Sequence, residues 1–292
     1  NGQAMDGFPI GFSAYSRYVA PVIEESLKAA PILYLFAANR IGFKLDAAIA
    51  GFAVGGGFAA IENVWYLFML PDANVGAWMV RGFGTAIMHG GATAFFAIIS
   101  HEMTERQAGS NAESYRFNPL LFLPGLAVAM LLHSAFNHFP DQPVLVMAAT
   151  LLLVPATLFF TFARNDTAAR QWLRTDHARH QQLLSDIRAG QFADTPAGTA
   201  LKAMARNLPT HRGIEVMQHA ELKIEMVLRA EELILAAQEG AAAIVSDDDR
   251  EKLKQLAAME HQLGDALVAA LNAKIGLTRN DLWELQSLRN RA

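Results

Sequence analysis

Cysteine is absent from the 292-residue sequence, which excludes a disulfide framework, a thiolate metal site and a cysteine nucleophile. Charge is also scarce, because 18% of the residues are charged and 52% are hydrophobic, with a net charge of -4. The basic face that binds nucleic acid is missing, so we expect no nucleic-acid partner. Most acidic residues follow Arg164. This asymmetry predicts a membrane domain over residues 1–165 and a polar domain over residues 166–292.

Long apolar runs fill the first domain. A membrane-spanning helix needs roughly 20 mainly apolar residues. Five stretches qualify by length and composition: 18–39, 45–70, 76–100, 119–139 and 143–163. The connectors between them are polar or contain proline. We therefore predict an all-α fold, with a polytopic transmembrane helix bundle followed by a soluble C-terminal helical domain.

Lysine and arginine residues in short connectors mark the cytoplasmic side of a membrane protein. They follow the first, third and fifth predicted spans, and the connectors 71–75 and 140–142 have none. Arg17 is the one exception. The pattern predicts an outer N-terminus and a cytoplasmic C-terminal domain. The residues that carry it are Arg40, Lys44, Arg106, Arg116, Arg164, Arg170 and Arg174.

Several ionisable side chains lie inside the predicted spans, where each charge costs at least roughly 2.5 kcal/mol. Because the spans alternate in direction, the acidic and histidine residues among them all fall in the outer half of the membrane. This convergence predicts a single polar site. Arg81 begins near the interface, so we expect it to extend toward lipid headgroups. The set comprises Glu24, Glu25, Lys28, Glu62, Arg81, His89 and His133.

Helical spacing groups the polar residues further. Lys28 lies within reach of both Glu24 and Glu25, and His133 shares a helix face with Asn137. Glycines surround Glu62 and His89, and we expect them to let helices approach closely. A phosphate-binding loop is excluded because no strand or following lysine accompanies them. These glycines are Gly51, Gly55, Gly56, Gly57, Gly82, Gly84, Gly90 and Gly91.

The residue types suit the hydrolysis of a peptide bond by an activated water molecule. Adjacent buried carboxylates resist double ionisation, so we expect Glu24 or Glu25 to hold a proton while Lys28 keeps the other charged. A carboxylate can deprotonate water, and a neutral histidine can relay the proton. His133 or Asn137 can donate to the resulting oxyanion. Two serines in the spans are interpreted as neutral helix residues, namely Ser26 and Ser134.

Other interpretations remain open at this point. The Glu24, Glu25 and Lys28 group can serve as a buried ion pair that orients helices. The polar cluster can also belong to a non-catalytic scaffold that binds a partner helix, or to a proton-coupled transporter. A zinc site is a further alternative, and its candidate ligands are Glu62, His89, His133 and His138.

The motifs Glu24-Glu25-x-x-Lys28, Phe58-x-x-x-Glu62-Asn63, His89 and His133-x-x-x-Asn137 follow one another on separate predicted spans. In this order the chain resembles the PrsW-type glutamic intramembrane proteases, of the CAAX protease and Abi superfamily. The resemblance covers residues 15–165. It implies metal-independent peptide hydrolysis without a cofactor, in a bacterial plasma membrane, on a membrane-protein substrate. In that family pattern the quoted carboxylates, Lys28 and both histidines form the site, and Asn137 supports the oxyanion. The family commonly has more spans, which fits a longer natural chain than one beginning at Asn1.

The polar half has amphipathic helical periodicity, with breaks at 190–196, 207–209, 240–249 and 276 that predict four or five helices. We expect a cytosolic bundle for assembly, substrate delivery or regulation, with homo-oligomerisation through these helices as one outcome. The run Asp247–Asp249 predicts a solvated loop and helix N-cap. The remaining histidines are expected at the surface, namely His177, His180, His211, His219 and His261.

Overall fold

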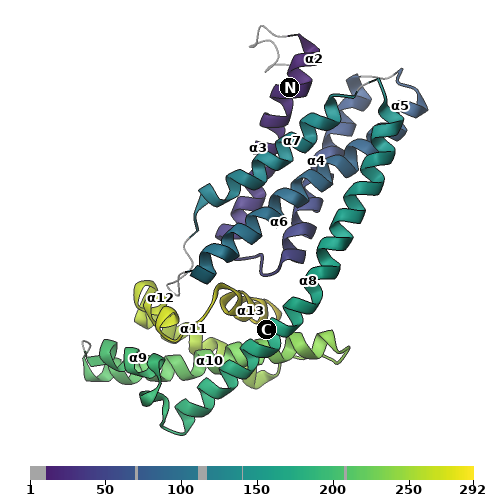
Figure 1. The fold of residues 1–292 in the computed structure, drawn as a ribbon. Coiled ribbons are helices and arrows are strands. Elements are labelled where there is room, and N and C mark those ends of the chain that lie inside the picture. The colour runs from purple at the N-terminus through teal and green to yellow at the C-terminus, as the bar shows by residue number, and fades with distance from the viewer. Residues whose placement is uncertain (1–10, 70–71, 111–116, 140, 207–208) are drawn as a thin grey trace. The chain divides into compact units, whose positions relative to one another are not determined.

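Every regular element that the structure describes is a helix, which confirms the predicted all-α fold (Figure 1). The structure is a computed structural model, and Arg116 of the predicted cytoplasmic connector lies outside its described residues. The described ranges are 11–69, 72–110, 117–139, 141–206 and 209–292.

Two compact units divide the chain. The membrane unit consists of residues 1–106 and 117–164, and the C-terminal unit consists of residues 107–116 and 165–292. Helix α8, Pro143–Arg188, contributes to both units.

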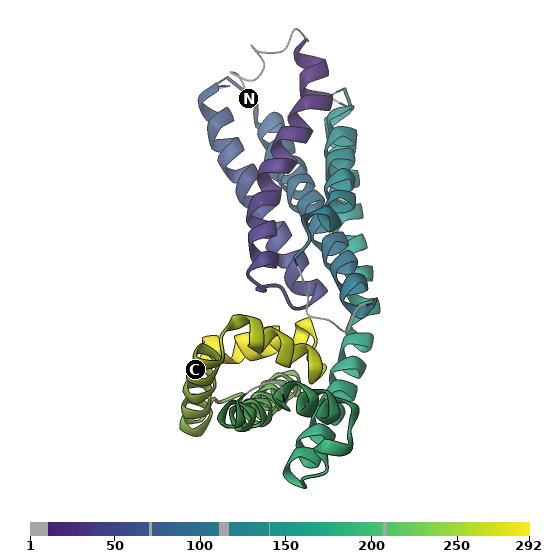
Figure 2. The ribbon, with the colours of Figure 1, turned by 90° about the vertical axis from the view of Figure 1, so that its left-hand side faces the viewer.

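The membrane unit is a bundle in which α3, α4, α6 and α7 run side by side (Figures 1 and 2). Short π-helical turns precede α3 and α6 without interrupting the helical course. The elements in chain order are α2 (Phe12–Ala14), η1 (Tyr15–Val19), α3 (Ala20–Ala37), α4 (Lys44–Met69), α5 (Val75–Met79), η2 (Val80–Thr85), α6 (Ala86–Ser110), η3 (Pro119–Phe122), α7 (Leu123–Asn137) and the first part of α8.

Four helical stretches are long and apolar enough to cross a membrane. They correspond to the last four predicted spans, so the chain is a multi-pass membrane protein. Helix α3 does not qualify by composition, because three charged residues fall within its 18 residues. A span at α3 therefore stays a prediction. The four stretches are Lys44–Met69, Val75–Gln107, Pro119–Asn137 and Pro143–Ala163.

Close contact between α4 and α6 positions the polar residues that these helices carry. A Cβ atom on Gly55 would lie 2.2 Å from the His89 carbonyl oxygen, and one on Gly51 would lie 2.5 Å from the Thr93 carbonyl oxygen. Only glycine permits this approach of the two backbones. Other predicted glycines do not have this packing role. A Cβ atom added to them would meet nothing within 4 Å, so the prediction is wrong for Gly56, Gly57 and Gly82.

The C-terminal unit is built from the second part of α8 and five further α-helices. Breaks fall at each predicted place, and Gly190, Gly240 and Gly276 adopt positive φ angles there. The sequence analysis missed one further break, at Gly264 between α11 and α12, where the φ angle is also positive. The helices share one apolar core that includes Leu201 and Ile224. The elements are η4 (Phe192–Asp194), α9 (Pro196–Arg206), α10 (Thr210–Gln238), α11 (Asp247–Leu263), α12 (Asp265–Lys274) and α13 (Arg279–Arg291).

The start of α11 differs from the prediction of a solvated loop. Ser246 is the N-cap and forms a capping box with Asp249, so Asp247–Asp249 make the first helical turn. Asp249 is only 6% exposed because it also pairs with Arg229.

A partly buried charge cluster joins α10, α11 and α13. Glu260 Oε1 lies 2.5 Å from Lys223 Nζ, and Glu260 Oε2 lies 2.6 Å from a terminal nitrogen of Arg289. Burial alone would raise the pKa of the Glu260 carboxyl, but His219, whose Nε2 atom lies 3.8 Å away, and the two cations hold that pKa well below its usual value of 4.5. His219 is itself fully buried, so its predicted surface position is wrong, because it packs against this carboxylate.

We expect Gly55→Val to lower the thermal stability of the detergent-solubilised protein, because the added atoms would clash with the α6 backbone. Overpacking of this kind costs about 1–3 kcal/mol. The matched control is Gly57→Val, where the new side chain enters open space. Equal melting temperatures for the two variants would contradict the close helix approach.

We expect Glu260→Gln to destabilise the C-terminal unit by about 3 kcal/mol, since it leaves the buried Lys223 ammonium without a carboxylate. The lowered Glu260 pKa means that its stabilisation is present above pH 4.5 and is lost as the pH falls below that value. Chemical denaturation measured across acidic pH should therefore show a weaker acid dependence in the variant. Glu251→Gln, whose side chain is 77% exposed, is the control and should match the parent.

Candidate active site

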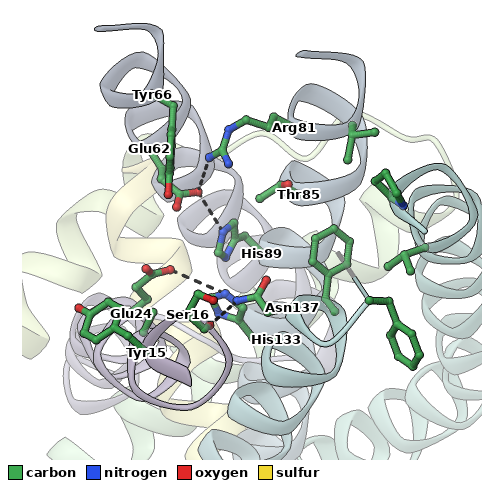
Figure 3. A pocket seen from close by; sticks show the side chains of 16 residues that line it. Tyr15, Ser16, Glu24, Glu62, Tyr66, Arg81, Thr85, His89, His133 and Asn137 are labelled. Atoms are coloured by element: carbon green, nitrogen blue, oxygen red, sulfur yellow. Dashed lines mark hydrogen bonds and ion pairs between the residues drawn. The ribbon is translucent and has the colours of Figure 1, made fainter. Parts of the chain in front are cut away.

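The structure brings every predicted site residue together in the membrane unit. Figure 3 shows side chains from α3, α4, α6 and α7 pointing toward a common cavity. Helix α3 supplies Glu24, Glu25 and Lys28, α4 supplies Glu62, α6 supplies His89, and α7 supplies His133 and Asn137.

Glu25 is the centre of a buried network. Its Oε1 atom lies 2.5 Å from Lys28 Nζ and 2.8 Å from His133 Nδ1. The same oxygen lies 3.9 Å from His89 Nδ1. The four side chains are each at most 4% exposed. Glu25 therefore orients one cation and one imidazole, and its contacts leave it little freedom to move.

The contact between Lys28 and His89 fixes the tautomer of the neutral histidine. Lys28 Nζ lies 2.7 Å from His89 Nδ1, and because an ammonium only donates, Nδ1 must accept. The His89 proton then resides on Nε2, which lies 3.4 Å from Glu62 Oε2. His89 thus directs an N–H group toward Glu62 and the cavity.

His133 has the opposite tautomer. Its Nδ1 donates to the Glu25 carboxylate, so the Nε2 atom of the neutral ring is an acceptor. That atom lies 3.8 Å from Glu24 Oε2, which is also an acceptor when ionised. Two acceptors at this separation suit a water molecule that donates one hydrogen to each, or a cation between them.

Glu24, unlike Glu25 and Lys28, lines the cavity. The cavity has a volume of about 360 Å³, enough for several water molecules. Its polar lining consists of Tyr15, Ser16, Glu24, Glu62, Tyr66, Arg81, Thr85, His89, His133 and Asn137. The two adjacent glutamates therefore differ in position, with Glu24 facing the cavity and Glu25 supporting the histidine beside it.

Arg81 does not extend toward headgroups, so that prediction is wrong. One of its terminal nitrogens lies 3.1 Å from Glu62 Oε2, and its guanidinium stacks over the Tyr66 ring at 3.6 Å. Asn63 Oδ1 accepts from Arg81 Nε at 3.2 Å. The ion pair with the carboxylate and the cation–π contact with the ring stabilise Arg81 in this position.

Two π-helical turns shape the cavity, and the sequence contained no signal for either. Tyr15–Val19 supplies Tyr15 and Ser16 to the lining, and Val80–Thr85 supplies Arg81 and Thr85. A π turn redirects side chains relative to a regular helix and is frequent at functional sites.

The amide of Asn137 has one contact already. Its nitrogen donates to the Ser16 carbonyl at 2.8 Å, which leaves one N–H group for a ligand. Ser134 donates to the Arg17 carbonyl and Ser26 to the Val22 carbonyl, in agreement with their interpretation as helix residues without a chemical role.

A metal ion fits one group of donors in the cavity. Ligand atoms of Glu24, His89 and His133 all lie within 4.8 Å of one another, and two histidines with one glutamate are a common catalytic zinc set. The predicted ligands Glu62 and His138 are not part of this group. His138 instead contacts the Ser134 carbonyl on α7 and the Tyr18 hydroxyl on η1.

A family model described as PrsW family intramembrane metalloprotease matches residues 8–163, more than half of the chain. The chain belongs to the PrsW family. It is therefore an intramembrane protease, as the resemblance implied. The searches of curated proteins and of solved structures found no match.

The family description bears on the cofactor of this PrsW-family protein. It names a metalloprotease, whereas the sequence resemblance implied metal-independent hydrolysis. The donor group of Glu24, His89 and His133 is compatible with either chemistry. In metal-independent hydrolysis a carboxylate activates the water molecule, and in metal-dependent hydrolysis a bound cation activates it.

A second cavity of the PrsW-family membrane unit is apolar. Its volume is about 740 Å³, and side chains of α6, α7 and α8 line it. It shares Phe136, Phe139 and Val146 with the polar cavity, so the two are neighbours. An apolar segment in this space would lie next to the polar cavity.

Proposed function

We propose that this protein hydrolyses a peptide bond in or near a transmembrane segment with a water molecule activated by Glu24. The observation that carries the proposal is the convergence of Glu24 Oε2 and His133 Nε2, 3.8 Å apart, on a polar cavity. A water molecule held by these two acceptors would have its oxygen lone pairs free to attack a carbonyl carbon.

The remaining residues have supporting roles in this proposal. Glu24 takes a proton from water as the new C–O bond forms, and the carbonyl electrons move onto oxygen. The His89 Nε2–H group and the free Asn137 N–H group are placed to donate to that oxyanion. Collapse of the intermediate breaks the C–N bond, and Glu24 returns the proton to the leaving amine. Glu25 and Lys28 are positioning residues that fix the tautomers of His133 and His89.

The apolar cavity supports a membrane-embedded substrate. A substrate segment that enters between α6, α7 and α8 would exchange lipid contacts for the apolar lining and reach the polar cavity past Phe136 and Phe139. The connector charges support a cytoplasmic position for the C-terminal unit. The bacterial plasma membrane stays a prediction from the family resemblance. Homo-oligomerisation through the C-terminal helices stays a prediction.

A zinc ion is the second candidate for water activation, favoured by the donor group and by the family description. Glu24, His89 and His133 would hold the ion. It would supply Lewis acidity and lower the pKa of a bound water molecule. His89 would need the other tautomer to offer Nε2 as a ligand, which the Lys28 contact disfavours.

We expect Glu24→Gln to reduce peptide hydrolysis by about 10²–10⁴-fold, because the amide cannot accept a proton from water. Terminal-peptide mass spectrometry on membranes from cells that produce each variant would detect the cleavage products. Glu102→Gln is the control, since Glu102 pairs with Lys44 away from the cavity. Equal product levels for Glu24→Gln and the parent would contradict the assignment of Glu24 as the general base. Absence of products from the folded parent would favour the scaffold or transporter interpretation.

We expect the purified protein to retain hydrolysis of a substrate found in this way after treatment with a strong zinc chelator. A glutamate base needs no ion, whereas a zinc enzyme loses activity and regains it when Zn²⁺ is added. Initial rates measured before chelation, after chelation and after Zn²⁺ addition distinguish the glutamate mechanism from the zinc mechanism. Loss followed by recovery would reject the glutamate mechanism and support the metal alternative.

A further inference from the structure

A second cluster of acidic and histidine residues lies wholly within the C-terminal unit. Ligand atoms of Asp176, His180, Glu231 and Asp281 are all within 4.8 Å of one another, and each residue is less than 9% exposed. The residues come from α8, α10 and α13. His180 was expected at the surface, and that prediction is wrong because the ring is enclosed between these helices.

The imidazole of His180 contacts one carboxylate and one guanidinium. Its Nδ1 atom lies 2.6 Å from Glu231 Oε1, and its Nε2 atom lies 3.0 Å from a terminal nitrogen of Arg179 and 3.6 Å from Asp281 Oδ2. His177 Nδ1 approaches the other Glu231 oxygen at 3.1 Å. Arg179 lies 2.7 Å from Asp176 Oδ1 and 3.6 Å from Asp281 Oδ2. The Arg179 guanidinium is therefore shared between the carboxylates of Asp176 and Asp281.

Glu284 adds a further carboxylate to this group. It lies one turn after Asp281 and is 0% exposed, and neither of its carboxylate oxygens has a hydrogen-bond partner among the residues that the structure describes. Asp281 Oδ1 and Asp176 Oδ2 also lack partners. Burial raises the pKa of Glu284 to about 9, and the charges of Glu231, Asp281 and Asp176 add to the effect. Glu284 lies on the same face of α13 as Asp281, because the two are three residues apart.

Buried carboxylates are ordinarily paired with cations or coordinate metal ions. Arg179 supplies only one positive charge, and its side chain is 45% exposed, so it can leave the cluster without unfolding the unit. The carboxylates that it contacts would then have oxygens available to a smaller cation. The spacings i,i+4 for Asp176 and His180, and i,i+3 for Asp281 and Glu284, direct pairs of ligands inward from facing helices.

We propose that Asp176, His180, Glu231 and Asp281, with Glu284 beside them, form a binding site for a divalent first-row transition-metal ion. Carboxylate oxygens together with an imidazole nitrogen favour Mn²⁺, Fe²⁺ or Zn²⁺ over Ca²⁺ and Mg²⁺, which prefer oxygen ligands alone. The bound ion replaces Arg179 as the counter-charge and links α8, α10 and α13. This site is separate from the cavity of the membrane unit and does not depend on the proposed peptidase mechanism.

The test uses the full chain with Glu24→Gln and His89→Ala, which remove the donors of the membrane unit. The detergent-solubilised protein is stripped with chelator and titrated with Mn²⁺ alone, and in a second series with Zn²⁺ alone. Equilibrium dialysis with elemental analysis gives the stoichiometry, and thermal unfolding gives the stabilisation. We expect about one ion per chain and a melting temperature that rises with metal concentration.

Two variants of this background test the assignment, and a third is the control. Glu231→Gln and Glu284→Gln should each weaken binding by about tenfold or more and reduce the rise in melting temperature. Glu251→Gln, with a side chain 77% exposed on the same unit, should bind as the background does. Glu284→Gln decides the matter if Glu231→Gln fails to fold, because the amide replaces a carboxyl of the same shape. Binding unaffected by Glu284→Gln, or no binding of either ion by the folded background protein, would overturn the proposal.

Discussion

The contact of the Glu25 carboxylate with Lys28 and His133 is the interaction on which the membrane unit depends. Three titratable groups at most 4% exposed are tolerable in an apolar bundle only when each satisfies the others. Their arrangement also sets the tautomers of both histidines, since an ammonium only donates and a carboxylate only accepts. A buried ion pair that orients helices and the proposed site of proton transfer therefore share the same atoms.

The backbone supports this network in two ways. Glycines on α4 let that helix touch the α6 backbone at His89, which places the ring between Lys28 and Glu62. The π-helical turns before α3 and α6 direct Tyr15 and Arg81 into the cavity lining. The site is thus held by whole helices and not by loops, as suits chemistry carried out where water is scarce.

The C-terminal unit also contains buried acidic groups, and they differ in how completely they are paired. Its buried acidic groups are compensated fully in one cluster, where Glu260 meets Lys223 and Arg289, and incompletely in the other, where Glu284 has no hydrogen-bond partner among the described residues. The first is a structural link between helices. The second retains unsatisfied oxygens inside an otherwise well-packed helical unit, and such atoms in native proteins usually have a ligand or a functional reason.

The sequence by itself determined the all-α membrane architecture, most of the helix breaks and the polar residues that meet in the membrane unit, because hydropathy and the cost of intramembrane charge are local properties of the chain. Only the tertiary structure separated Glu24 from Glu25, since neighbours in sequence on a helix point in different directions and their partners come from α6 and α7. Arg81 and His180 were misjudged for the same reason. A side chain's partner, whether Glu62 or Glu231, lies on another helix, and no local pattern specifies which helices meet.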